Sequence, residues 1–258
     1  MLENLRDNGI SLSKILMFFL VLFLIIFGLY FLISDMNNND FLIVNENLIL
    51  TKSGSKWKQI DTLDDNILDK TYHVRTLDND YDDVIVSYDA DSNSWYYMNK
   101  NYNDLNLKKV QLAYTKKFKG VKRADYDVSY YDESDDDILS DVLKDKAIDD
   151  FKKSVVKRSF DIDGDGTLET IYTLTNESLV ESPGKKYSYI FLVKGDSLVK
   201  MLDDDTSTPY IVRNIIDIDN DGKYEVIVSK GDVDVSTFNS CYQIYKINGD
   251  KVKRIMDC

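Results

Sequence analysis

The sequence is poor in the residues on which most catalytic systems depend. It has one histidine, His73, among 258 residues, so a Ser-His or Cys-His pair has a single candidate base. No G-x-S-x-G, H-E-x-x-H or P-loop pattern occurs in it. A carboxylate-based hydrolase stays open as an alternative, because acidic residues are abundant and their separations cannot be read from sequence. The composition otherwise favours a binding protein over an enzyme.

Positive charge is also scarce. There are 32 Lys and Arg residues against 45 Asp and Glu, which gives a formal net charge of -13. Such a chain repels the phosphate backbone, so a nucleic-acid partner is not expected. The surplus of carboxylates suits hard cations, which prefer oxygen ligands.

The longest apolar segment is "ILMFFLVLFLIIFGLYFLI", residues 15–33, which contains no charge. As a helix it would be roughly 28 Å long, close to the hydrocarbon thickness of a bilayer. A signal peptide would have a shorter apolar core and a small-residue cleavage site, and neither is present. We therefore expect an uncleaved transmembrane helix.

The flanks of this segment predict its orientation. Arg6 and Lys14 precede it, whereas Asp35 and Asp40 follow it, so the positive-inside rule places the N-terminus in the cytoplasm. The expected layout is a single-pass cell-membrane protein whose C-terminal part is extracytoplasmic. Its expected segments are a cytoplasmic tail (1–14), the transmembrane helix (15–33), a linker (34–41), an N-terminal β region (42–133), a helix (134–153) and a C-terminal β region (154–258).

The two β regions and the helix are predicted from periodicity. Short runs rich in Val, Ile and Tyr, bounded by Asn, Asp, Ser and Gly, indicate antiparallel strands. In residues 134–153 the apolar positions fall on one helical face. Ser134 is the expected N-cap, and Asp135, Asp136 and Asp137 are expected to be solvated in the first turn. The fold class is thus mainly β with one amphipathic helix.

Two segments of the C-terminal region repeat each other. "VKRSFDIDGDGTLETIYTL" and "VRNIIDIDNDGKYEVIVSK" align Asp161 with Asp217 and Glu169 with Glu225, a period of 56 residues. Such a period is in the range of a β-propeller blade or a similar strand repeat. A weaker echo, "YHVRTLDNDYDDVIVS" at 72–87, keeps acidic residues but lacks the glycine.

The repeated loop resembles an EF-hand only in its first half. An EF-hand needs a bidentate glutamate at position 12, where this chain has Tyr172 and Val228. The residues after each loop are β-branched and favour strands over helices. The pattern D-x-D-x-D-G-x-x-E therefore predicts an acidic loop between two strands.

Each acidic loop could hold calcium. Carboxylates at positions 1, 3, 5 and 9 would converge, position 7 could add a backbone carbonyl, and water would complete the shell of 6–8 oxygens that calcium takes. Glycine at position 6 permits the bend. Metal-free hairpin turns remain the alternative. The predicted ligands are Asp161, Asp163, Asp165, Thr167 and Glu169 in the first loop, and Asp217, Asp219, Asp221, Lys223 and Glu225 in the second.

Both copies resemble the calcium-binding repeats of FG-GAP and VCBS-type proteins, the type found in integrin α chains. The resemblance covers residues 155–229 well and 72–87 poorly. It implies a β-propeller-like or divergent β-repeat fold, a role in adhesion or ligand binding, and calcium that stabilises the repeats. The chain departs from that family in lacking a clear FG…GAP strand motif and in having only two good loops.

The two cysteines, Cys241 and Cys258, both lie in the part expected to be exported. An oxidising compartment would allow them to pair, although the sequence leaves their geometry open.

The leading functional hypothesis is a membrane-anchored, calcium-binding β domain that recognises a protein or a surface polysaccharide without catalysis. The alternatives are a glycan hydrolase and a structural subunit of a membrane complex.

Overall fold

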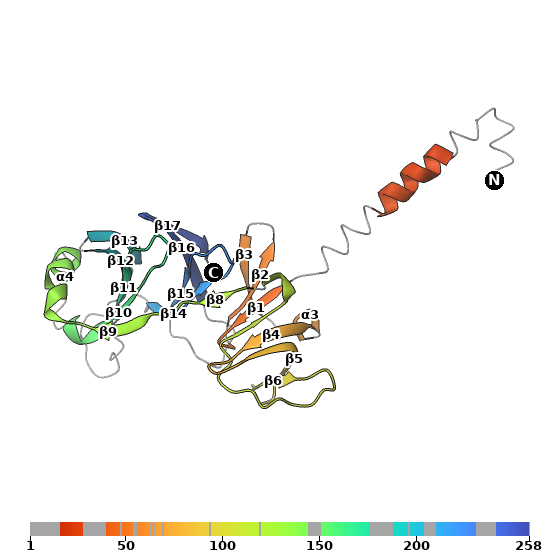
Figure 1. The fold of residues 1–258 in the computed structure, drawn as a ribbon, viewed down its shortest axis with the longest axis horizontal. Coiled ribbons are helices and arrows are strands. Elements are labelled where there is room, and N and C mark those ends of the chain that lie inside the picture. The colour runs from red at the N-terminus through yellow and green to blue at the C-terminus, as the bar shows by residue number, and fades with distance from the viewer. Residues whose placement is uncertain are drawn as a thin grey trace. The chain divides into compact units, whose positions relative to one another are not determined.

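The chain forms two compact units, Met1–Asn39 and Asp40–Cys258, in the computed structural model (Figure 1). The structure describes residues 16–27, 40–46, 48–53, 56–61, 63, 65–68, 70–92, 94–118, 120–143, 151–175, 188–195, 197–203, 210–230 and 241–257.

In the N-terminal unit, residues 16–27 form a helix whose apolar side chains are all exposed, from 40% at Leu22 to 69% at Leu16. No helix in the described part of the chain has both the length and the apolar character that crossing a membrane requires. Residues 15 and 28–33 of the predicted span lie outside the described residues. The transmembrane helix therefore stays a prediction.

The second unit begins with a seven-stranded antiparallel sheet in the order β3-β2-β1-β7-β4-β5-β6. A short helix, α3 (Asp65–Leu68), lies between β3 and β4 in the chain. The strands are β1 (Phe41–Val44), β2 (Leu48–Ser53), β3 (Lys56–Ile60), β4 (Thr71–Arg75), β5 (Asp80–Asp89), β6 (Ser94–Met98) and β7 (Leu112–Tyr114).

Two further antiparallel sheets each have five strands, in the orders β13-β12-β11-β10-β9 and β17-β16-β15-β14-β8. The first pairs five consecutive strands in chain order, whereas in the second four consecutive strands form a meander and a short strand from earlier in the chain is added at the edge. The strands are β8 (Lys122–Arg123), β9 (Asp127–Tyr130), β10 (Val155–Phe160), β11 (Glu169–Thr175), β12 (Ser188–Lys194), β13 (Ser197–Asp203), β14 (Tyr210–Asp217), β15 (Glu225–Lys230), β16 (Cys241–Asn248) and β17 (Lys251–Met256).

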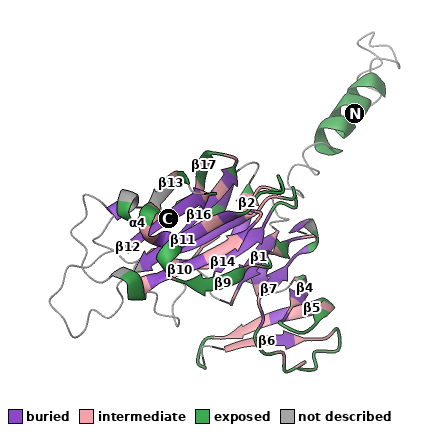
Figure 2. Cartoon of the chain, turned by 60° about the vertical axis from the view of Figure 1, so that its left-hand side comes forward, coloured by how far each residue is buried: buried purple, intermediate pink, exposed green. Residues whose placement is uncertain are grey.

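The sheet containing β14–β17 is packed on both faces. Ile227 of β15 belongs to a core shared with the seven-stranded sheet, whereas its neighbours Val226 and Val228 belong to a core shared with the β10–β13 sheet. This explains why "EVIVSK" is almost continuously buried, because successive residues of a strand point to opposite faces. The buried strands of the three layers are visible in Figure 2.

The outer face of the β10–β13 sheet is covered by α4 (Asp136–Leu143). Leu139 and Leu143 of this helix pack against Tyr172 and Phe191. The 3-10 helices are η1 (Lys116–Phe118), η2 (Glu133–Asp135) and η3 (Phe151–Ser154). The part of the predicted helix at 144–150 lies outside the described residues.

The start of this helical segment differs from the prediction. Asp132, not Ser134, is the N-cap, and Asp132 and Asp135 form a reciprocal capping box around η2. Asp135 is 3% exposed and accepts hydrogen bonds from Lys157 Nζ at 2.9 and 3.1 Å and from Tyr172 Oη at 2.8 Å. The expectation of a fully solvated acidic turn was wrong for Asp135, because Lys157 on β10 supplies a buried counter-ion.

The mainly β fold with antiparallel pairing is confirmed for the described residues. None of the three sheets closes on itself, since each has two edge strands among the residues the structure describes.

Candidate metal centre

The two acidic loops occupy equivalent places in the two meanders. The first joins β10 to β11, with Phe160 and Glu169 as the last cross-strand pair. The second joins β14 to β15, where Ile216 pairs with Glu225. Each loop therefore leaves one strand at position 1 and returns with its glutamate at the start of the next, as the sequence predicted.

The backbone bends where the sequence places glycine or asparagine. Gly166 and Gly222, at position 6, have φ of 86° and 84°, and Gly164 and Asn220, at position 4, have φ of 75° and 56°. Glycine adopts this left-handed region without the steric cost of a Cβ, and asparagine tolerates it better than most residues. The expected bend at positive φ is confirmed in both loops.

The first aspartate of each loop organises the turn. Asp161 accepts hydrogen bonds from the N–H groups of residues 164, 165 and 166 at 2.8–3.1 Å. Asp217 accepts them from Asp221 and Gly222, both at 3.0 Å. These bonds stabilise the charged carboxylates and use some, though not all, of their lone pairs.

Three carboxylates converge in each loop. Oxygens of Asp161, Asp163 and Glu169 all lie within 4.8 Å of one another, and so do those of Asp217, Asp219 and Glu225 (the first and second carboxylate triads). The structure thus brings positions 1, 3 and 9 together and leaves position 5, Asp165 and Asp221, outside both triads. At position 7, the N–H groups of Thr167 and Lys223 donate to those two aspartates at 2.8 and 3.0 Å.

The glutamates are the most buried members of the triads. Glu169 is 1% exposed and Glu225 is fully buried. Oε2 of Glu169 accepts a hydrogen bond from the N–H of Ile162 at 2.9 Å, and Oε2 of Glu225 accepts one from the N–H of Ile218 at 3.0 Å. Oε1 is also buried and accepts no hydrogen bond, and in both glutamates it lies within ion-pair distance of a lysine ammonium.

Sequence reasoning missed two lysines that face these triads. Lys194 of β12 is the cross-strand partner of Glu169, and Lys246 of β16 is that of Glu225. Lys194 Nζ lies 2.5 Å from Asp165 Oδ2 and 2.7 Å from Glu169 Oε1. The repeat in the sequence did not point to these lysines, because they are 52 residues apart and the period of the repeat is 56 (246 − 194 against 217 − 161).

Lys246 makes the fuller set of contacts. Its Nζ lies 3.0 Å from Asp219, 2.8 Å from Asp221 and 3.0 Å from Glu225 Oε1. The last contact has the distance of an ion pair without the angles of a hydrogen bond. Each ammonium therefore lies against the buried glutamate of a triad.

Burial and charge shift the pKa values in the second loop. Burial raises the pKa of Glu225 to about 7, although the Ile218 N–H and the Lys246 ammonium both act to lower it. Burial tends to lower the pKa of Lys246, but its hydrogen bonds to Asp221 and Asp219 outweigh this and raise it. Without a further cation, this loop holds more negative charge than one lysine can neutralise.

The two loops lie against each other. The N–H of Tyr224 donates to the carbonyl of Ile162 at 2.9 Å, and the N–H of Gly249, in the β16–β17 turn, donates to Asp163 Oδ2 at 2.5 Å. A Cβ added to Gly164 would lie 3.3 Å from the carbonyl oxygen of Gly222. The second loop and the β16–β17 turn thus both contact the first loop, and the turn donates to one of its carboxylates.

The third, weaker echo forms the β4–β5 hairpin, but its carboxylates do not converge. Asp80 accepts two hydrogen bonds from Arg75, at 2.8 and 3.1 Å, and Asp82 contacts His73 Nδ1. His73 also stacks on Tyr114, with ring centroids 5.4 Å apart. Each acid is paired with its own base, so this hairpin is not a candidate metal site.

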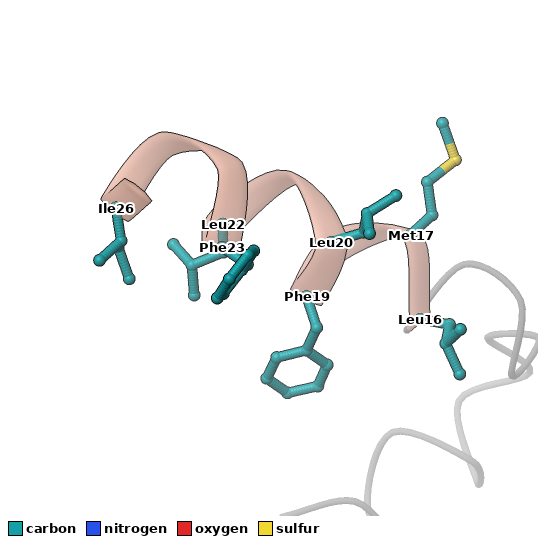
Figure 3. A pocket seen from close by; sticks show the side chains of 7 residues that line it. All are labelled: Leu16, Met17, Phe19, Leu20, Leu22, Phe23 and Ile26. Carbon is teal, nitrogen blue, oxygen red and sulfur yellow. The ribbon is translucent and has the colours of Figure 1, made fainter. Parts of the chain in front are cut away.

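Two other features bear on function. The hollow in Figure 3 is lined by apolar side chains of the helix at 16–27 alone, so it has no polar group to orient a small molecule. Cys241 is disulfide-bonded, and the second cysteine of the chain, Cys258, lies outside the described residues.

No protein-family model matches this sequence, and neither the curated proteins nor the solved structures contain a significant match to it.

Proposed function

We propose that the unit of residues 40–258 is a non-catalytic binding module with one calcium ion in each acidic loop. The observation that carries this proposal is the pair of carboxylate triads, each with a buried glutamate oxygen that accepts no hydrogen bond. Buried carboxylate oxygens are costly unless a cation or a donor satisfies them.

The donor set fits a hard cation. Every ligand atom in the triads is a carboxylate oxygen, and an ion at 2.3–2.6 Å from each would suit the observed spread. The ligands come from a loop with further backbone carbonyls and open access to water, which favours calcium, with its 6–8 ligands, over the strict octahedron of magnesium. Thr167 and Lys223 would add their carbonyls at position 7.

The position of the loops indicates what calcium would do. Each loop fixes the first hairpin of a meander, and the two loops touch through Tyr224 and Ile162. Calcium would therefore stabilise the contact between two sheets, as expected of a divergent repeat of the FG-GAP and VCBS type. The molecule that the binding module recognises would be a protein or a surface polysaccharide.

We propose further that the segment 15–33 anchors this module in a membrane, with the module on the extracytoplasmic side. Support comes from the uninterrupted apolar sequence and from the exposure of the apolar side chains at 16–27. The disulfide at Cys241 favours an oxidising compartment.

Thermal unfolding of the full chain in mild detergent, with calcium or with a chelator, tests the calcium sites. Calcium that binds only the folded state adds about 2.7 kcal/mol per site at a hundredfold excess over its Kd. We expect a higher midpoint with calcium, and loss of that increase in the double variant Asp163→Asn, Asp219→Asn. The matched control is Asp91→Asn, an exposed aspartate in another turn. An unchanged midpoint at millimolar calcium in the wild-type chain would show that the loops are hairpin turns that bind no calcium.

A further inference from the structure

The lysines opposite the triads have the same place in both repeats. Lys194 pairs with Glu169 and Lys246 with Glu225, each in the strand that follows the loop hairpin. Their side chains are 27% and 25% exposed, so each has a path from the carboxylates to solvent. Two equivalent placements make a chance contact a poor explanation.

Each ammonium contacts at least one of the carboxylates that a metal ion would need. Lys246 contacts Asp219 and Glu225, two of the three members of the second triad. Lys194 contacts Glu169 in the first triad. Lone pairs directed at an ammonium are not available to calcium, and two cations sharing one small group of oxygens repel each other strongly.

The lysine also has a clear role without metal. Glu225 is fully buried, and a buried carboxylate needs a counter-charge nearby to stay ionised. An ammonium on a flexible four-carbon stem can supply that charge and can also withdraw, because its stem reaches solvent.

We propose that Lys194 and Lys246 are internal competitors of calcium: each occupies the metal position of its loop in the metal-free protein and must swing out before the ion binds. This inference rests on the proposed calcium sites, and in it the two lysines set the affinity of those sites for calcium. The apparent Kd is the intrinsic Kd divided by the fraction of molecules in which the lysine is out. The metal-free protein stays folded because the lysine stabilises the loop, and calcium replaces that stabilisation.

Calorimetric titration of the full chain in detergent with calcium chloride tests the proposal. If the lysine is out in roughly a tenth of molecules, Lys246→Met lowers the Kd of the second site about tenfold. Lys246→Arg, which keeps a cation in place, leaves the Kd unchanged or raises it. The charge-matched control is Lys253→Met, an exposed residue that pairs with Lys246 across β16 and β17, and it shifts the Kd little.

A second measurement guards against a variant that folds poorly. In chelator, Lys246→Met unfolds at a lower midpoint than the wild type, and saturating calcium removes the difference. Lys194→Met tests the first loop in the same way. An unchanged or higher Kd in both methionine variants would overturn the displacement while leaving calcium binding intact. Absence of binding heat in all of these proteins, wild type included, would instead overturn the proposed function.

Discussion

Glu225 makes the stability of the metal-free protein depend on pH in an unusual direction. Its pKa is raised from 4.5 to about 7 by burial. Between these two pH values the folded state holds a proton that the unfolded state has released. The unfolding free energy therefore decreases as the pH rises through this window, the reverse of the effect of a carboxylate whose pKa is lowered on folding.

The magnitude follows from the gap between the two pKa values. At ~1.36 kcal/mol per pH unit, a rise from 4.5 to about 7 corresponds to about 3 kcal/mol of stability lost across the window. Glu225 is fully buried, so little solvent screening reduces this figure. That loss is large compared with the 5–15 kcal/mol by which domains are usually stable.

Urea unfolding of the full chain in chelator at several pH values between 4.5 and 8, followed by tryptophan fluorescence, measures this effect. The control variant is Glu225→Gln, which cannot ionise but can still accept the hydrogen bond from Ile218. All other carboxylates are common to both proteins, so their contributions cancel in the difference. We expect the stability of the wild type relative to Glu225→Gln to decrease by about 3 kcal/mol as the pH rises. Parallel pH profiles, or a relative gain by the wild type, would refute the reasoning.

Two further predictions concern packing, and both are measured as unfolding free energies. Gly164→Ala should destabilise more than Gly166→Ala: both residues have positive φ, which costs roughly 1 kcal/mol for alanine, but only the first Cβ would crowd a backbone atom, the Gly222 carbonyl at 3.3 Å. Equal losses would show that the loops can separate freely. Lys157→Met should cost about 3 kcal/mol, because it leaves Asp135 buried without its counter-ion. A loss below about 1 kcal/mol would mean that the Tyr172 hydroxyl is enough to satisfy that carboxylate.

Much of the acidic loops could be predicted because their shape is set locally. The spacing of Asp161, Asp163 and Glu169 and the glycine at position 6 depend on backbone rules that act over a few residues. The same holds for the strand character of the flanking runs. The structure confirms the bend and the strands, while the calcium itself stays a prediction.

The misjudged features depend on side chains from neighbouring elements or strands. Asp135 was expected in solvent because it looked like part of a first helical turn, yet Lys157 on another element buries and neutralises it. The acid–base pairs of the β4–β5 hairpin, Arg75 with Asp80 and His73 with Asp82, span only five and nine residues, but they depend on the register of the hairpin.

The sequence by itself determined the β character of the chain, the position of the turns and the acidic residues that the turns gather. Only the tertiary structure decided which basic side chains contact these acidic residues. Lys194 precedes the glycine of its turn directly, whereas Lys246 lies three residues before Gly249, so sequence alignment does not make them equivalent. Strand pairing makes the two lysines equivalent, because each lies opposite a loop glutamate on the neighbouring strand. Register is a long-range property, fixed by the packing of whole sheets, and it places one ammonium beside each buried glutamate.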